Sequence, residues 1–192
     1  MTLIPATVPL PALPRRRQLL LGTALAAGAS AMFQLALVGM YLNERAAHKN
    51  VWLTENTIPL TQPNMMLGTL VLACVFVQWA VWAIARNERG QSFLALGVTL
   101  LLGFGFLNQA TFLWTEVKMP LTSVEGPLFY ATTGANFFAI AASLVYLALM
   151  SIRAIGGQFS SRRPDGISAP ALFFYVNVAV YAVIWLAVHI MK

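Results

Sequence analysis

The scarcest feature of this 192-residue sequence is charge. Only 9% of its residues are Asp, Glu, Lys or Arg, whereas 59% are hydrophobic and the mean hydropathy is +0.73. In soluble domains roughly a quarter of the residues are charged. This shortage of charge excludes an ordinary soluble domain and indicates an integral membrane protein.

Cysteine and histidine are nearly absent. Cys74 is the single cysteine, which excludes an intrachain disulfide, and a thiol in an apolar run usually packs as a small hydrophobe. A haem b within a bilayer commonly needs histidine ligands inside helices, but His48 and His189 lie outside or at the end of the apolar runs. We therefore expect no cofactor in this chain. A metal site shared by the two histidines, or a copper-handling Met65–Met66 pair, is an alternative to ordinary loop, interfacial and packing roles.

Five apolar runs follow one another along the chain. As helices rising about 1.5 Å per residue, each can cross the roughly 30 Å hydrocarbon core of a bilayer. We predict an all-α polytopic membrane protein, a five-transmembrane-helix bundle over residues 18–192, with Pro170 in the first turn of the last helix. The proline-rich residues 1–17 are expected to form a disordered cytoplasmic tail. The expected spans are about 18–42, 64–85, 91–114, 127–152 and 170–190.

The start of the chain also resembles a cleavable export signal. Arg15, Arg16 and Arg17 precede the first apolar run, as in a twin-arginine signal, and Ala29-Ser30-Ala31 imitates a cleavage site. The apolar character continues to Leu42, however, which is long for a signal and suits a retained span. We expect an uncleaved first helix, with an exported, processed protein as the alternative.

Basic residues are divided unequally between the two sides of the predicted bundle. By the positive-inside rule, the N-terminus is cytoplasmic and the C-terminus is outside. The net charge of +6 is thus explained by membrane orientation, and no nucleic-acid partner is expected. The inner side carries Arg15, Arg16, Arg17, Arg86, Arg89, Arg153, Arg162 and Arg163, and the outer side carries Arg45, Lys49, Lys118 and Lys192.

Amides replace charges inside the predicted spans. No Asp, Glu, Lys or Arg lies in the body of a span, which argues against a pump or a proton-coupled carrier. An amide in lipid needs a hydrogen-bonding partner, so these side chains should face the bundle or a cavity. They either join helices to one another or form a polar patch for a lipid headgroup or a partner subunit. We expect Gln34, Asn108 and Asn136 in the outer half of the membrane, and Gln78 and Asn177 nearer the inner half.

Small residues recur at every fourth position of the fourth span. Such a stripe lets another helix approach closely. We therefore predict a helix-packing face made by Ala131, Ala135, Ala139 and Ser143.

Several segments resemble subunit III of haem-copper (cytochrome c type) oxidases in its short, five-helix bacterial form. The first span resembles the opening helix of that family, from Gly22-Thr23 through Phe33 to Met40-Tyr41. Pro63-Asn64, Gln78 and Glu88-Arg89-Gly90 are similar to its next helix and turn. The segment 126–134 contains the family's Phe-Tyr-x-x-Thr-Gly pattern, here Phe129-Tyr130-Ala131-Thr132-Thr133-Gly134.

The sequence departs from this family at its intramembrane ionisable positions. Ser30 stands where the family has a carboxylate, and Phe112-Leu113 stands where it has a Tyr-Glu pair. Asn136 and Ala139 replace histidines, while Tyr175 and Val178 replace a histidine and an aspartate. The resemblance therefore implies the fold and a supporting role without an inherited proton relay, in which Tyr175 and Asn136 keep hydrogen bonding without titrating.

The resemblance implies a non-catalytic subunit that packs against the catalytic subunit of a terminal oxidase in a bacterial plasma membrane. Haem and copper are expected in that partner, and membrane lipids are expected as further partners. The candidate lipid or subunit contacts are Gln34, Gln78, Asn108, Asn136, Tyr175 and Asn177. An accessory subunit of nitric oxide reductase and a small neutral-solute permease are the alternatives.

Overall fold

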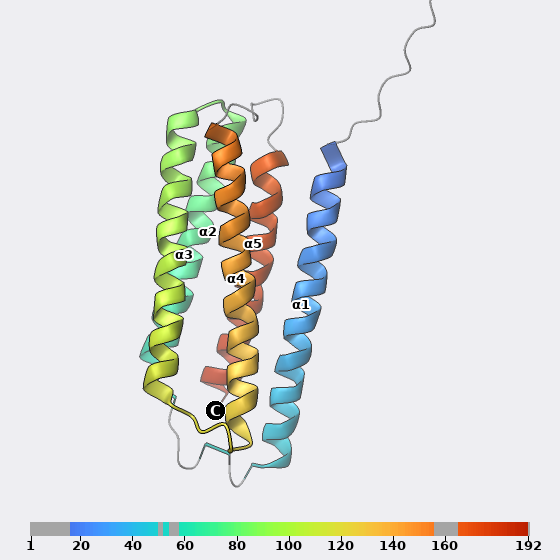
Figure 1. Ribbon diagram of the computed structural model, residues 1–192, viewed down its shortest axis with the longest axis vertical. Coiled ribbons are helices and arrows are strands. Elements are labelled where there is room, and N and C mark those ends of the chain that lie inside the picture. Colours follow the sequence, from blue (N-terminus) through green and yellow to red (C-terminus); the bar gives the residue numbers. More distant parts are fainter. Residues whose placement is uncertain (1–15, 50–51, 54–57, 156–164, 192) are drawn as a thin grey trace, which may run out of the picture.

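A computed structural model describes residues 16–49, 52–53, 58–155 and 165–191. In these residues five long helices run side by side, and each is long and apolar enough to cross a membrane (Figure 1). The predicted all-α fold is confirmed. The helices are α1 (Arg16–Ala47), α2 (Thr61–Ala85), α3 (Arg89–Val117), α4 (Glu125–Ile155) and α5 (Asp165–Ile184), which continues as the π-helix η1 (Trp185–Ile190).

The described helices extend beyond the predicted spans. Helix α1 already includes Arg16 and continues to Ala47, because the polar residues at its ends lie outside the hydrocarbon and can still be helical. Most of the predicted tail, residues 1–15, lies outside the described residues, as do Arg162, Arg163 and Lys192.

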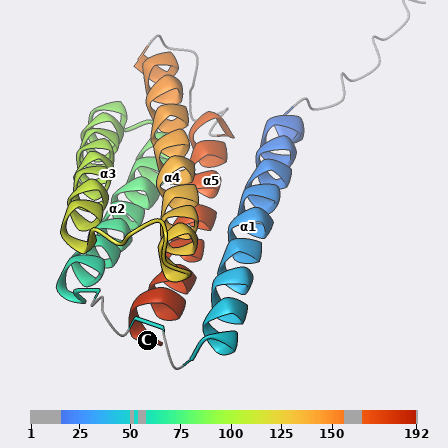
Figure 2. The same cartoon turned by 60° about the horizontal axis from the view of Figure 1, so that its bottom comes forward.

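Helices α1 and α3 form opposite edges of the bundle, as both views show (Figures 1 and 2). Helix α5 is the central element, packing against α1, α4 and α2. Half of its most apolar window is buried, compared with 22% for α1. Successive helices alternate in direction, so α1, α3 and α5 begin at the same end of the bundle.

Pro170 does not begin the last helix, contrary to our prediction. Helix α5 starts at Asp165 and Pro170 lies inside it. An internal proline removes one backbone hydrogen bond, but membrane helices tolerate it because neighbouring helices support the backbone. The earlier start lengthens α5 by more than one turn and shifts its central residues toward the middle of the membrane.

Two glycines permit close contacts around α4. A Cβ atom at Gly103 of α3 would collide with the side chain of Leu144, so this glycine allows α4 to approach. A Cβ atom at Gly126, in the first turn of α4, would collide with the backbone carbonyl oxygen of Pro120. A side chain at Gly126 would meet fixed backbone, whereas a side chain at Gly103 would require the Leu144 side chain to shift.

The predicted small-residue stripe of α4 winds around the helix. Ala131 is exposed, Ala135 and Ala139 are half-buried, and Ser143 is buried. Four residues turn an α-helix by slightly more than one full turn, so every-fourth spacing drifts by about 40° at each step. The buried face of α4 follows a mixed three- and four-residue spacing through Phe129, Thr132, Asn136, Ile140, Ser143 and Leu147.

Candidate functional site

Three predicted amides meet where α1, α4 and α5 come together. Gln34 from α1, Asn136 from α4 and Asn177 from α5 are each at most 1% exposed. The Nε2 atom of Gln34 donates to Oδ1 of Asn177 at 2.9 Å. The Nδ2 atom of Asn136 donates to Oε1 of Gln34 at 2.8 Å and to the backbone oxygen of Asn177 at 3.1 Å. These bonds join α1, α4 and α5 at the same height along the bundle.

Two serines extend this group. The hydroxyl of Ser30 donates to Oδ1 of Asn177 at 3.0 Å and accepts from Nε2 of Gln34 at 3.0 Å. The Nδ2 atom of Asn177 donates to the hydroxyl of Ser143 at 3.3 Å, and that hydroxyl donates to the backbone oxygen of Ala139. We call Ser30, Gln34, Asn136, Ser143 and Asn177 the amide cluster.

The cluster corrects the predicted level of Asn177. Because Asn177 bonds to both Gln34 and Asn136, it lies at their level and not nearer the inner side. A helix that starts at Pro170 would place Asn177 nearer the inner side than it lies in the structure. The serines were not predicted as members either, although Ser30 precedes Gln34 by one turn and Ser143 follows Asn136 by two turns, which are same-face spacings.

The cluster is chemically neutral. Its amides and hydroxyls do not titrate near physiological pH, so it cannot store or release a proton as a carboxylate or imidazole can. Each interhelical bond of this kind stabilises a membrane bundle by about 0.6 to 2 kcal/mol. Two buried atoms, Oδ1 of Asn136 and Oγ1 of Thr132 one turn away, accept no hydrogen bond from the described residues. The arrangement holds helices together and provides no acid–base chemistry.

Gln78 and Tyr175 form a second, separate pair. The hydroxyl of Tyr175 on α5 donates to Oε1 of Gln78 on α2 at 2.9 Å, on the exposed side of the α2–α5 contact. Nearer the opposite end of the same contact, Nε1 of Trp185 donates to Oδ1 of Asn64 at 2.8 Å. These two bonds join α2 to α5 and to its continuation η1. The sixth predicted residue, Asn108, lies apart from both groups, exposed on α3.

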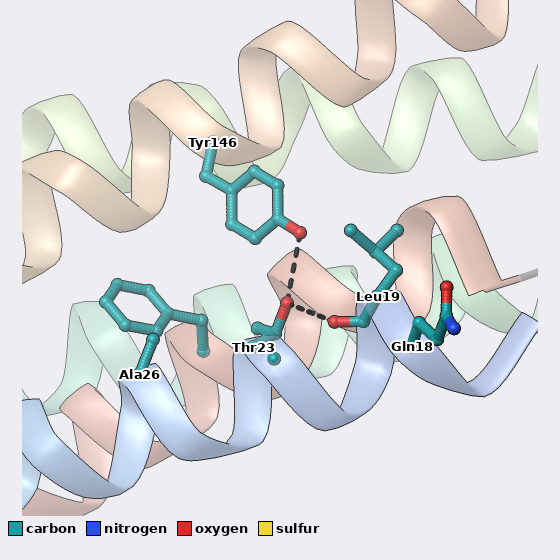
Figure 3. A pocket seen from close by; sticks show the side chains of 7 residues that line it. Gln18, Leu19, Thr23, Ala26 and Tyr146 are labelled. Carbon is teal, nitrogen blue, oxygen red and sulfur yellow. Dashed lines mark hydrogen bonds between the residues drawn. The ribbon is translucent and has the colours of Figure 1, made fainter.

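An open crevice lies near the N-terminal end of α1 (Figure 3). Thr23 donates to the backbone oxygen of Leu19 at 2.9 Å, so the hydroxyl of Tyr146 is the donor in its 3.1 Å bond to Thr23. This bond connects α1 to α4 inside the crevice. The crevice has a volume of about 380 Å³ and is lined by Gln18, Leu19, Gly22, Thr23, Ala26, Tyr146 and Phe173.

The two histidines have different surroundings. His48 is exposed just after α1, where its Nδ1 lies 3.3 Å from Oε2 of Glu44. His189 is 2% exposed in η1, and its ring lies edge-on to Phe129 with the ring centroids 6.4 Å apart. In the part of the chain that the structure describes, no group of three or more His, Cys, Asp or Glu residues could hold a metal ion.

Comparison with known proteins identifies the family. The family model for cytochrome c oxidase subunit III matches residues 30–192. The chain belongs to this family. It is similar to cytochrome c oxidase subunit 3 of Carassius auratus, with 26% identity over 132 residues, and to that of Strongylocentrotus purpuratus, with 28% identity over 132 residues. These matches cover 68% and 67% of this chain but 51% and 50% of the relatives, so the chain spans about half the length of the curated relatives it matches.

Family membership confirms the resemblance found in the sequence. The low identity agrees with a divergent member, and the comparisons do not favour a nitric oxide reductase subunit or a permease. Ser30 and Asn136, two of the positions at which the resemblance implies a departure from the family, belong to the amide cluster.

Proposed function

We propose that this protein is a non-catalytic, subunit III-like component of a terminal haem-copper oxidase, which packs against the catalytic subunit and stabilises it. The observation that carries the proposal is the match of the subunit III family model to residues 30–192. The relatives are named as subunits of cytochrome c oxidase, and this chain corresponds to about half of their length. The proposal therefore extends the role of these relatives to a chain that spans about half of their length.

The neutral interior supports a scaffolding role. The bonds among Gln34, Asn136 and Asn177 stabilise the contact of α1, α4 and α5 but offer no titrating group for proton transfer. On this proposal the redox chemistry takes place in the catalytic subunit, which carries the haem and copper. This chain contributes a rigid helical surface, and it takes part in aerobic respiratory electron transport through its partner.

The proposed location is a bacterial plasma membrane, with the N-terminus cytoplasmic and the C-terminus outside. Arg86, Arg89 and Arg153 lie at the end of the bundle where α1 begins, whereas Arg45 and Lys118 lie at the other end (Figure 1). Cationic residues are retained preferentially on the cytoplasmic side. The charge asymmetry supports this orientation.

Membrane lipid is the second proposed partner. The crevice between α1, α4 and α5 is open, and most of its lining is apolar (Figure 3). An acyl chain in this crevice would lie beside the Thr23–Tyr146 bond. Lipid there would fill the space that separates the N-terminal part of α1 from the other helices.

Affinity purification in a mild detergent tests the proposed function. The tagged chain, expressed in its native host, should bring down a larger polypeptide together with a haem a or haem b spectrum. Mass spectrometry should identify that polypeptide as an oxidase catalytic subunit. Recovery of the chain without any haem protein, or transport of a neutral solute by the purified chain alone in liposomes, would contradict the proposal.

A further inference from the structure

Asn108 is an exposed amide in the middle of a membrane-facing helix surface. It is exposed on α3, at the edge of the bundle opposite α1 (Figures 1 and 2). Among the residues that the structure describes, none hydrogen-bonds to its side-chain amide; the hydroxyl of Thr111 bonds to its backbone oxygen only. Large apolar side chains are exposed on the same face of α3. Leu101 is 73% exposed, Phe104 63% and Phe112 48%.

Asn108 lies too deep in the membrane to hydrogen-bond with water or with lipid headgroups. Helix α3 has 29 residues. At about 1.5 Å per residue it exceeds a 30 Å hydrocarbon core by roughly 6 to 7 Å at each end. Asn108 lies about two and a half turns before Val117, and therefore roughly 7 Å inside the hydrocarbon. Acyl chains offer no hydrogen-bonding group at that depth, so a free amide is costly there.

The neighbouring polar side chains of α3 differ from Asn108. The hydroxyls of Thr111 and Thr115 donate to backbone oxygens of their own helix, at 2.8 and 2.7 Å. Gln109, beside Asn108, has its Oε1 atom buried without a partner among the described residues. Gln78, an exposed amide of α2, has its Oε1 bonded to Tyr175. Within the hydrocarbon part of α3, Asn108 and Gln109 thus both carry amide groups without a partner among the described residues.

Two glycines make the same surface accessible to another helix. A Cβ atom at Gly97 or at Gly105 would meet nothing within 4 Å, so both glycines border open space. Small residues at a helix surface allow a second helix to approach, and amides then hydrogen-bond across the contact. Within this chain α3 packs chiefly on α2 and α4, on the opposite side from Asn108.

We propose that the outer face of α3, defined by Gly97, Leu101, Phe104, Gly105, Asn108 and Phe112, docks a transmembrane helix of another subunit that presents a hydrogen-bonding side chain to Asn108. This inference rests on the proposed function, since the family to which the chain belongs is named for subunits of a larger complex. The partner helix satisfies the amide of Asn108 and packs over the two glycines. The outer face of α3 is therefore the side of the bundle that contacts the rest of the complex.

Photo-crosslinking in native membranes tests the proposal directly. Phe104→p-benzoylphenylalanine and Phe112→p-benzoylphenylalanine keep an aromatic ring one turn to either side of Asn108 and should form adducts with a second, different polypeptide. The matched control is Phe33→p-benzoylphenylalanine on α1, because Phe33 is 63% exposed like Phe104. Adducts with lipid alone, or with another copy of this chain, would overturn the proposal.

Substitutions that keep the isolated bundle intact give a second test. Gly105→Leu adds a side chain to open space in this chain but obstructs an approaching helix, and Asn108→Leu removes the amide. Both should lower the amount of co-purified partner by about three- to tenfold, the range expected for a polar helix–helix contact in a membrane. Gly28→Leu, at an open position of α1, is the control and should retain the partner. Undiminished co-purification with both α3 variants would contradict the docking surface.

The outcomes separate the docking surface from the proposed function. Adducts to a polypeptide that belongs to no oxidase would uphold the surface and contradict the function. An oxidase that co-purifies with the wild-type chain, without protein adducts at either α3 position, would uphold the function and reject the surface.

Discussion

Asn136 and Gln34, which are 102 residues apart in the sequence, share a buried 2.8 Å hydrogen bond between α4 and α1. This bond attaches the edge helix to the bundle, since Gln34 also bonds to Asn177 of the central helix α5. Helix α1 buries less of its apolar surface than α5 does. Directional polar bonds therefore add to the apolar packing that attaches α1 to the bundle.

Asn177→Leu should be the most destabilising single change in the amide cluster. It leaves Ser30, Gln34 and Ser143 without the side-chain bonds they now make to Asn177. Leaving buried polar groups unsatisfied costs about 1 to 3 kcal/mol. Equilibrium unfolding in detergent, followed by circular dichroism, measures this loss. Phe138→Ala, at a side chain that is 71% exposed, is the control and should change stability by no more than about 0.5 kcal/mol.

Gln34→Leu and Asn136→Leu should be strongly coupled. Each single change leaves one amide atom of the other residue without its 2.8 Å partner, whereas the double change removes both ends of this bond together. The double variant should therefore lose less stability than the sum of the single variants, by about 0.5 to 2 kcal/mol. The same unfolding measurement, made on the wild type, the two single variants and the double variant, gives the coupling energy. Strict additivity would show that the two amides do not depend on each other.

The helices were predictable from the sequence, but the grouping of their polar residues was not. Apolar runs long enough to cross a bilayer need only be counted, and all five appear in the structure. Which amides meet depends on the rotation and level of each helix, and the early start of α5 moved Asn177 from its predicted level. Ser30 and Ser143 gave little signal, because a serine in a helix can bond to its own backbone.

The resemblance to a known family predicted more about function than periodicity did. The resemblance singles out Ser30, and both the resemblance and the amide pattern single out Asn136; both residues are members of the amide cluster. The sequence does not predict the pairing of Gln78 with Tyr175, because the two residues lie 97 positions apart on different helices. Contacts between α2 and α5 depend on three-dimensional packing that one sequence does not encode in a local pattern.

Alanine substitutions at three glycines should change the stability of the protein to different degrees, depending on the atoms that each new Cβ would meet. Gly126→Ala should destabilise most, because the backbone oxygen of Pro120 cannot move aside easily. Gly103→Ala should cost less, since it meets the flexible end of Leu144. Gly134→Ala meets nothing within 4 Å and should be neutral or stabilising by up to about 1 kcal/mol. Thermal unfolding in detergent gives the order; equal effects at all three positions would contradict these contacts.

Tyr146→Phe should loosen the N-terminal part of α1 without unfolding the bundle. It removes the 3.1 Å bond to Thr23, which connects α1 to α4 across the crevice. A membrane hydrogen bond of this kind contributes about 0.6 kcal/mol on average. Hydrogen–deuterium exchange should speed up in residues 18–26. Thr69→Val, which removes a bond made only to Met65 of its own helix, is the control and should leave α1 unchanged.

The central claim is that this chain supports a redox partner and holds no redox centre itself. The most direct measurement is the haem content of the intact purified complex and of each chain after the complex is dissociated in detergent. The account predicts that all haem remains with the larger catalytic chain and that the isolated 192-residue chain is colourless. Stoichiometric haem absorbance in the isolated chain would contradict it.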